Sequence, residues 1–333
     1  MNLSSKIYVA GHRGLLGSAL VRRLSAGGYS NLVVRTHSEL DLTEQLAVRE
    51  FFVKERPEHV FLAAAKVGGI LANSTYPADF ISQNLLIQTN VIHQAYLVGV
   101  KHLLFLGSSC IYPKHAPQPI KEEYLLTGPL ELTNRPYALA KISGIEMCWS
   151  YNRQYGTRFL AAMPTNLFGP GDRYDLHNSH VIPALIRKMH EAKVAGADRV
   201  VIWGTGTPRR EFLYSDDAAE ACVFLMNLAD DKLVPLVANG QLPPVVNIGC
   251  GEDMTVRELS ELIADVVGFS KKLVFDRLLP DGTPRKLLDT RHLTALGWKP
   301  CTSLREGLEK TYQDYLRHGA LAPDSHSVAT IAV

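Results

Sequence analysis

The chain has 333 residues, enough for two domains or for one large α/β domain with an added lobe. Hydrophobic residues make up 46% and charged residues 20%, a balance that excludes intrinsic disorder and is typical of a globular protein with a large core. The 35 basic and 33 acidic residues leave a net charge of +2, which excludes the strongly basic surface that nucleic-acid binding requires.

Short apolar segments of strand length alternate with helical patterns through the first half of the chain. The helical patterns include a leucine stripe at positions 15, 16, 20 and 24, a helix from Pro77 to about Val98 and a helix from Pro136 to Tyr155. The predicted strands cover residues 7–10, 31–35, 60–64, 102–106 and 158–163. Strands separated by helices are joined by right-handed crossovers, so the sequence predicts an α/β fold with a doubly wound parallel sheet of the Rossmann type.

After Pro164 the alternation loosens, and strand-like segments at 200–203 and 273–275 lie between helices. This change predicts a smaller, interleaved C-terminal lobe. The apolar segment 245–249 is expected to return to the main sheet. We predict a Rossmann domain formed by residues 1–170 together with about 212–250. A second lobe is formed by residues 171–211 and 251–320, and residues 321–333 are a flexible tail.

A glycine-rich segment directly follows the first predicted strand: Gly11-His12-Arg13-Gly14-Leu15-Leu16-Gly17. Glycines at a strand-to-helix turn allow the backbone N–H groups of a helix N-terminus to approach a pyrophosphate. The alternative is that the segment is a plain tight turn. The position of the segment in a strand–helix–strand pattern favours dinucleotide binding.

The end of the second predicted strand carries no acidic residue. An NAD site commonly offers a carboxylate to the ribose there, whereas this sequence has Arg35, with Arg13 in the glycine loop. Guanidinium groups bind a 2′-phosphate, so the pattern favours NADP(H), unless Arg35 is a solvated strand end. His37 and Arg35 are both candidates for a second phosphate contact. Asp41 is placed either to contact the adenine or to cap the next helix.

A proton-transfer set is predicted at the end of the fourth strand. Tyr137 and Lys141 are four residues apart at the start of a helix, so both lie on one face of it. Ser108 follows the fourth strand, at the carboxyl edge where such sheets bind ligands. Lys141 is expected to favour the phenolate of Tyr137, which exchanges a proton with a carbonyl or alcohol that Ser108 orients.

Together these motifs resemble the extended short-chain dehydrogenase/reductases and, within that group, the GDP-L-fucose synthase family. The resemblance extends from about residue 6 to 315 and is strongest in the blocks 11–17, 63–70, 75–80, 107–114, 163–167 and 178–183. It implies an NADPH-dependent enzyme that converts GDP-4-keto-6-deoxy-D-mannose to GDP-L-fucose by epimerisation at C3 and C5 and reduction at C4. It also implies a homodimer built through the helices 77–98 and 136–155.

The resemblance also implies roles for individual residues. By this resemblance, Cys110 is the base and His180 the acid of the epimerisation. Without the resemblance, the sequence would indicate a small buried residue at Cys110 and a helix-cap histidine at His180. The implied GDP-sugar contacts are Lys188, Trp203, Arg210 and Asp281. Beyond the glycine loop, the implied cofactor contacts are Leu106, Gly107, Ser108, Ser109, Tyr137, Lys141, Pro164, Thr165, Asn166, Leu167 and His180.

Three other functions fit parts of the pattern. A nucleotide-sugar 4,6-dehydratase ordinarily has an acidic pair beside the serine, where this chain has Ser109 and Cys110. A simple 4-epimerase needs no Cys/His pair. A non-catalytic NADP(H) sensor has no need for Ser108, Tyr137 and Lys141 together.

The cysteine pattern points to a reducing compartment. The five cysteines are odd in number and are scattered, with no CxxC pair and no metal-type spacing, so neither disulfides nor a metal site is expected. The sequence shows no signal peptide and no apolar segment of membrane-spanning length. We therefore expect a cytoplasmic enzyme.

Overall fold

The computed structural model describes residues 1–176, 179–278, 281 and 283–319. The expected tail at 321–333, the last residue of the expected lobe at position 320, and Asn178 of one similarity block lie outside the described residues. Within the described residues, no helix is both long and apolar enough to cross a membrane.

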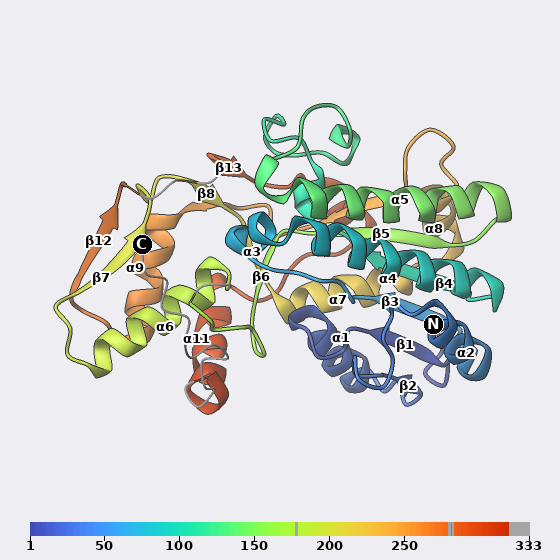
Figure 1. The fold of residues 1–333 in the computed structure, drawn as a ribbon, viewed down its shortest axis with the longest axis horizontal. Helices are drawn as coiled ribbons and strands as arrows, with labels where there is room; N and C mark the ends of the chain where they lie inside the picture. The colour runs from blue at the N-terminus through green and yellow to red at the C-terminus, as the bar shows by residue number, and fades with distance from the viewer. Residues whose placement is uncertain (177–178, 279–280, 282, 320–333) are drawn as a thin grey trace.

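The large part of the molecule is built on a parallel sheet of six strands (Figure 1). The strand order is β10-β5-β4-β3-β1-β2, so the chain reverses its direction of winding at β1, as a doubly wound sheet does. This order confirms the predicted fold class. The strands are β1 (Ile7–Ala10), β2 (Leu32–Val33), β3 (His59–Leu62), β4 (His102–Leu106), β5 (Phe159–Pro164) and β10 (Val245–Ile248).

Helices cover both faces of this sheet because both faces of its strands are apolar. In β1, Tyr8 and Ala10 pack into one buried cluster, and Ile7 and Val9 pack into another. On the first face lie α2 (Gln45–Glu55), α4 (Pro77–Leu97) and α5 (Arg135–Tyr155). On the second lie α1 (Leu15–Ala26), α7 (Ser215–Met226), α8 (Asp230–Val237) and α10 (Arg291–Leu296).

A smaller lobe lies beside the large sheet (Figure 1). Its parallel pair is β7 (Arg199–Trp203) with β12 (Lys272–Asp276), and its three-stranded sheet has β8 (Arg209–Arg210) between β11 (Met254–Thr255) and β13 (Arg285–Lys286). The pair β6 (Asn166–Phe168) and β9 (Phe212–Tyr214) connects the two parts. The helices of the lobe are α6 (Val181–Val194), α9 (Val256–Val267), α11 (Leu304–Asp314) and the π-helix η4 (Tyr315–Gly319).

Short helices occur in the connections around β3 and β4. They are α3 (Ile70–Thr75), before α4, and the 3-10 helices η1 (Ser109–Ile111), η2 (Glu122–Tyr124) and η3 (Leu132–Asn134), which lie between β4 and α5.

The chain returns to the large part twice. β10 pairs with β5, as expected for the segment 245–249. Leu293 of α10 and Trp298 after it are also buried in the cluster formed by α1 and α7, a return that the sequence did not indicate. β2 is shorter than expected, because this edge strand pairs with β1 through two residues, Leu32 and Val33.

The buried carboxylate of Glu211 links the two parts. Its side chain accepts hydrogen bonds from the backbone N–H groups of Gly251 (2.7 Å) and Leu288 (3.0 Å). Its backbone oxygen accepts bonds from the side chains of Thr165 (3.2 Å) and Asn166 (2.8 Å), at the end of β5 and the start of β6. One residue thus fixes the segments after β5, β10 and β13 relative to one another.

Asn247, a fully buried residue of β10, forms a second link. Its amide oxygen accepts a hydrogen bond from the hydroxyl of Tyr112 at 2.6 Å. Its amide nitrogen donates to the backbone oxygens of Ile120 (2.9 Å) and Asp289 (3.2 Å). The loop after η1 and the segment before α10 are therefore both held on the central sheet.

We expect Asn247→Ala to lower the free energy of unfolding by about 2 to 4 kcal/mol, because three buried partners lose their hydrogen bonds. Urea unfolding followed by circular dichroism measures this. The matched control is Asn31→Ala, at an exposed asparagine, with an expected change within about 0.5 kcal/mol. Equal effects of the two substitutions would contradict the role of Asn247.

Candidate active site

The candidate active site lies at the carboxyl edge of the large sheet. Parallel strands end at the same edge, so the residues after β1, β4 and β5 meet there. The glycine loop follows β1, Gly107 and Ser108 follow β4, and β5 ends at Pro164, followed by Thr165, Asn166 and Leu167. The predicted cofactor residues are therefore brought to one edge by the topology.

The glycine loop has the close backbone packing that a dinucleotide site requires. Gly11 has φ +82°, and a Cβ atom there would lie 2.7 Å from the backbone nitrogen of Ala64. A Cβ atom on Gly17 would overlap the backbone oxygen of Gly11. Nδ1 of His12 is buried and has no hydrogen-bond partner among the described residues. These features fit a diphosphate bound at the N-terminus of α1, whose first helical residue is Leu15.

The two arginines expected at the 2′-phosphate are arranged differently from each other. Arg13 is exposed in the glycine loop. Arg35 donates to the backbone oxygen of Val34 and forms an ion pair with Glu55, both at 2.7 Å. The charges of Arg35 and Arg13 both act on the Glu39 carboxylate, so the two cations border the same region. Of these two arginines, Arg13 has no ion pair with any of the described residues.

Asp41 does not cap the next helix, because Glu44 holds the N-cap position of α2. Oδ1 of Asp41 accepts hydrogen bonds from the backbone nitrogen (2.9 Å) and the hydroxyl (2.8 Å) of Thr43, so the side chain closes the turn before α2. Nε2 of His37 lies 3.8 Å from Oδ2 of Asp41. An adenine contact stays a prediction.

Ser108 and Cys110 form a tight turn after β4. Ser108 caps η1, and its hydroxyl accepts a hydrogen bond from the backbone nitrogen of Cys110 at 3.4 Å. Cys110 is 8% exposed. Burial raises the pKa of its thiol, while the charges of Lys286 and Lys141 and a hydrogen bond with Ser108 act in the opposite direction.

Tyr137 and Lys141 lie in the first two turns of α5 and face this turn. The ammonium of Lys141 donates to the backbone oxygen of Leu106 at 2.7 Å and lies over the rings of Phe105 and Tyr137, at 4.8 and 5.7 Å. Burial lowers the pKa of Lys141 to about 8. Burial, with the nearby Cys110, raises the pKa of Tyr137, and a hydrogen bond with Ser108 opposes this rise. The phenol is therefore protonated at neutral pH.

Lys286, in β13, is a site residue that the sequence did not single out. Its charge acts on Cys110, on His180 and on Arg210. His180 directly precedes α6 and is exposed. Desolvation of its ring by the surrounding protein, and then the charge of Lys286, lower the pKa of its imidazole. A basic dipeptide in a long loop carries no local signal of this placement.

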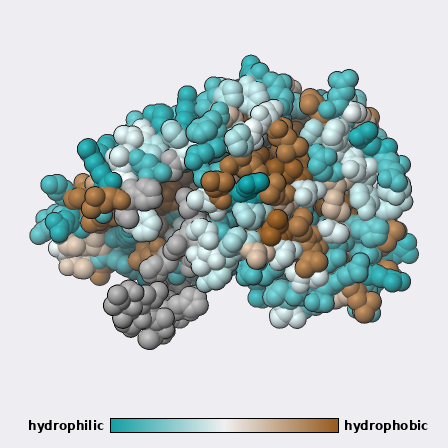
Figure 2. Space-filling model, turned by 45° about the horizontal axis from the view of Figure 1, so that its top comes forward, coloured by the Kyte–Doolittle hydropathy of each residue, from teal (hydrophilic) through white to brown (hydrophobic). Residues whose placement is uncertain are grey.

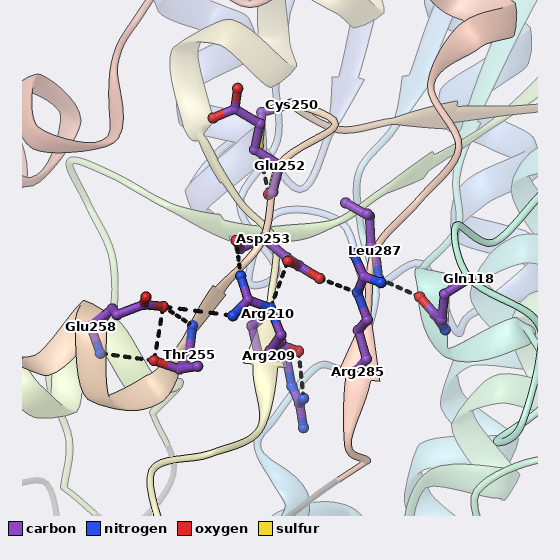
Figure 3. Close-up of polar contacts among 10 residues, drawn as sticks. All are labelled: Gln118, Arg209, Arg210, Cys250, Glu252, Asp253, Thr255, Glu258, Arg285 and Leu287. Carbon is purple, nitrogen blue, oxygen red and sulfur yellow. Dashed lines mark hydrogen bonds and ion pairs between the residues drawn. The ribbon is translucent and has the colours of Figure 1, made fainter.

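The four expected GDP-sugar residues form two groups in the smaller lobe. The ammonium of Lys188 lies 5.4 Å from the ring centre of Trp203, whose side chain is largely exposed. Arg210 donates to the backbone oxygen of Arg209 at 2.8 Å (Figure 3). The charge of Asp281 also acts on the guanidinium of Arg210. The side chain of Asp281 holds the turn at Thr205 through bonds of 2.9 and 2.7 Å.

Comparisons with known proteins identify the family of the chain. The NAD dependent epimerase/dehydratase family model matches residues 7–249. The chain is 59% identical to GDP-L-fucose synthase 1 of Arabidopsis thaliana over 315 residues, which are 95% of this chain and 94% of that protein. It is 54% identical to GDP-L-fucose synthase of Escherichia coli (strain K12), over 94% of this chain and 97% of that protein.

A solved structure has the same fold. The GDP-L-fucose synthetase from Naegleria fowleri bound to NADP matches with a TM-score of 0.85 and 27% sequence identity. The match covers 97% of each chain.

We expect Arg13→Ala to weaken NADPH binding about tenfold to a hundredfold, because one charge-assisted phosphate contact is worth about 1.5 to 3 kcal/mol. Binding of NADH, which lacks the 2′-phosphate, is expected to change little. Fluorescence titration with both cofactors measures this. Arg49→Ala, at an exposed arginine of α2, is the control. Unchanged NADPH affinity in the Arg13 variant would refute the assignment.

Proposed function

The chain belongs to the NAD dependent epimerase/dehydratase family and, within it, to the GDP-L-fucose synthases, and we propose that five side chains at the sheet edge carry out the reaction. It converts GDP-4-keto-6-deoxy-D-mannose to GDP-L-fucose, with NADP(H) as cofactor. The five side chains are Ser108, Cys110, Tyr137, Lys141 and His180. The observation that carries the proposal is that Tyr137 and Lys141 of α5 interact with Ser108 and Cys110 in the turn at the end of β4.

The reduction uses Tyr137, Ser108 and Lys141. When bound, NADPH supplies the hydride that reduces C4 of the sugar. Tyr137 donates its phenolic proton to the C4 oxygen, which suits a phenol that burial keeps protonated. Ser108 orients that oxygen by a hydrogen bond. Lys141, fixed by the backbone oxygen of Leu106, places a positive charge behind the phenol.

The epimerisation uses Cys110 and His180. The C4 carbonyl acidifies the protons at C3 and C5, so a base on one face of the ring removes each proton and leaves an enolate. Cys110 acts as that base, and the nearby charges of Lys286 and Lys141 favour its thiolate. His180 returns a proton from the opposite face. Because its pKa is lowered, its protonated ring is a stronger acid than an ordinary histidine.

This pair separates the proposed reaction from the alternatives. A simple 4-epimerase has no use for Cys110 and His180, and a cofactor sensor has no use for the proton-transfer set. Cys110 interacts with Ser108 and Tyr137, and the charge of Lys286 acts on both Cys110 and His180, which supports one bound substrate for both chemistries.

We expect Cys110→Ser and Tyr137→Phe to separate the two reactions. Serine is not ionised at pH 7 without a dedicated base, so Cys110→Ser should slow C3 and C5 proton exchange with D₂O by several orders of magnitude. Tyr137→Phe should retain exchange and lower C4 reduction by about 10² to 10⁴. NMR of the keto-sugar in D₂O, with and without NADPH, measures both rates.

The matched control is Cys148→Ser, at a buried cysteine of α5 that lies outside the site. It tests whether replacing any buried thiol has the same effect. GDP-L-fucose formation by Cys110→Ser at near wild-type rate would mean that the thiol only fills space. His180→Asn is expected to allow exchange without inversion at C3 and C5.

The homodimer is also part of the proposal. Hydrophobic residues gather on the face of the molecule that carries α4 and α5 (Figure 2). A shallow hollow between the first turns of these helices is lined by Arg135 and by the apolar residues Pro77, Ala78, Ile81, Pro136 and Leu139. Leu86 and Leu139 are exposed on the same pair of helices. Such a face suits a symmetric four-helix interface with a second copy.

We expect Leu139→Glu to weaken dimer formation at least about tenfold, because a two-fold interface buries the new charge twice. Sedimentation velocity over a concentration series measures association. The control is Val194→Glu, at a 74% exposed residue of α6 on the other lobe. A monomeric wild-type protein, or a variant that associates as the wild type does, would contradict the proposed interface.

The proposal also assigns a role to each of the two parts of the chain. Residues 1–170 with about 212–250 bind the cofactor, and residues 171–211 with 251–320 bind the GDP-sugar. A cytoplasmic location is supported by the five cysteines, of which no two are paired.

A further inference from the structure

Four positive side chains lie on two adjacent strands of the smaller lobe. β8 is Arg209-Arg210 and β13 is Arg285-Lys286, and the strands are parallel, with Arg285 opposite Arg209 and Lys286 opposite Arg210. Like charges directly opposite each other destabilise a sheet. This pair of strands therefore needs negative charge to stay in register.

Asp253 supplies that charge on one face of the sheet (Figure 3). It directly precedes β11, in which Thr255 lies opposite Arg209, so alternation places Asp253, Arg209 and Arg285 on the same face. Oδ1 of Asp253 lies 2.8 Å from Nε of Arg209, and Oδ2 lies 2.5 Å from Nε of Arg285. Nη2 of Arg209 also donates to the backbone oxygen of Asp253 at 2.8 Å.

This carboxylate is buried and ionised. The side chain of Asp253 is 4% exposed. Burial opposes its ionisation, but hydrogen bonds from Arg285 and Arg209 hold its pKa below the ordinary value. Glu258, the other carboxylate nearby, is 56% exposed, lies 3.8 Å from Nη1 of Arg209 and caps α9 with Thr255. Asp253 is thus the carboxylate that bridges both strands.

The other face carries Arg210 and Lys286. Within the described part of the chain, neither has a carboxylate at salt-bridge distance. Asp281 acts on Arg210 from further away, and Lys286 acts on Cys110 and His180. Two positive charges thus remain beside the proposed epimerisation groups, where an anionic diphosphate is expected to bind.

The backbone beyond Lys286 is fixed independently. The backbone nitrogen of Leu287 donates to the side-chain oxygen of Gln118 at 2.9 Å, and that of Leu288 donates to Glu211. These bonds hold the path of the chain but do not balance the charges of its side chains. Charge balance at β8 and β13 depends on Asp253.

We propose that Asp253 is a positioning residue for the active site: by neutralising Arg209 and Arg285 on one face, it keeps β8 and β13 in register, so that Arg210 and Lys286 face the GDP-sugar and Cys110. The inference rests on the proposed function for the roles of Arg210 and Cys110. It concerns a residue that touches neither the substrate nor the cofactor.

The charges around Cys110 define what the test measures. Lys286 of β13 and Lys141 of α5 favour its thiolate, Ser108 forms a hydrogen bond with it, and Tyr137 of α5 interacts with it. If Lys286 loses its position, the pKa of Cys110 rises, because the largest favourable charge is weakened. The acid limb of the epimerisation pH profile then moves to higher pH.

The test compares Asp253→Asn, which keeps the shape but removes the charge, with the wild-type enzyme. We expect KM for the GDP-keto-sugar to rise about tenfold and the acid limb of C3 and C5 exchange in D₂O to move up by about half a pH unit or more. The dissociation constant for NADPH should stay within about twofold of wild type, because the glycine loop lies in the large part of the molecule.

The matched control is Glu258→Gln, which removes the carboxylate that contacts one strand, while glutamine still serves in a capping box. Its KM and pH profile should equal those of the wild type. Should Asp253→Asn fail to fold, the double variant Asp253→Asn with Arg285→Gln removes one of the two repelling charges as well and is expected to give a smaller change in the same direction.

A folded Asp253→Asn enzyme with wild-type KM and an unshifted pH profile would overturn the inference. A uniform fall in kcat without either change would also overturn it, because that is the result of a purely structural role. Absence of C3 and C5 exchange in the wild-type enzyme would instead overturn the proposed function.

Discussion

The carboxylate of Glu211 is the contact on which the geometry of the active site depends. Its two oxygens bind the backbone nitrogens of Gly251 and Leu288, and its backbone oxygen binds the side chain of Asn166. These partners follow β10, β13 and β5, so one buried residue sets the distance between the cofactor half and the substrate half. Arg210 directly precedes Glu211, and Lys286 lies two residues before Leu288. The same carboxylate therefore holds the backbone on which both cations lie.

Burial has opposite effects on the groups that we propose for the two reactions. It raises the pKa of Tyr137 and keeps the phenol protonated, as an acid for reduction requires. It also raises the pKa of Cys110, which works against a base, and the charges of Lys286 and Lys141 offset part of this rise. Burial lowers the pKa of Lys141 to about 8, which leaves it charged at neutral pH. The cations of the site thus partly offset the desolvation that raises the pKa of the thiol.

Local patterns in the sequence predicted the central sheet well. The strands at 7–10 and 102–106 have the predicted bounds, because each is a short apolar segment between clear turn and helix signals. The glycine loop and the Tyr137 helix were likewise found from local spacing. Lys286 and Asp253 were not, because their roles arise from the pairing of β8, β11 and β13, which are far apart in the sequence. Pairing of that kind leaves no periodicity for sequence analysis to detect.

The position of β10 has a consequence for how the protein is synthesised. β10 covers the edge of β5, a strand buried along its whole length, but its residues leave the ribosome only after the first segment of the smaller lobe. Until then the nascent chain presents an apolar strand edge that can pair with other chains. The large domain therefore cannot complete its folding co-translationally as an independent N-terminal module. A fragment that ends near residue 170 would expose the edge of β5, which is prone to aggregation. In the full-length chain β10 pairs with this edge.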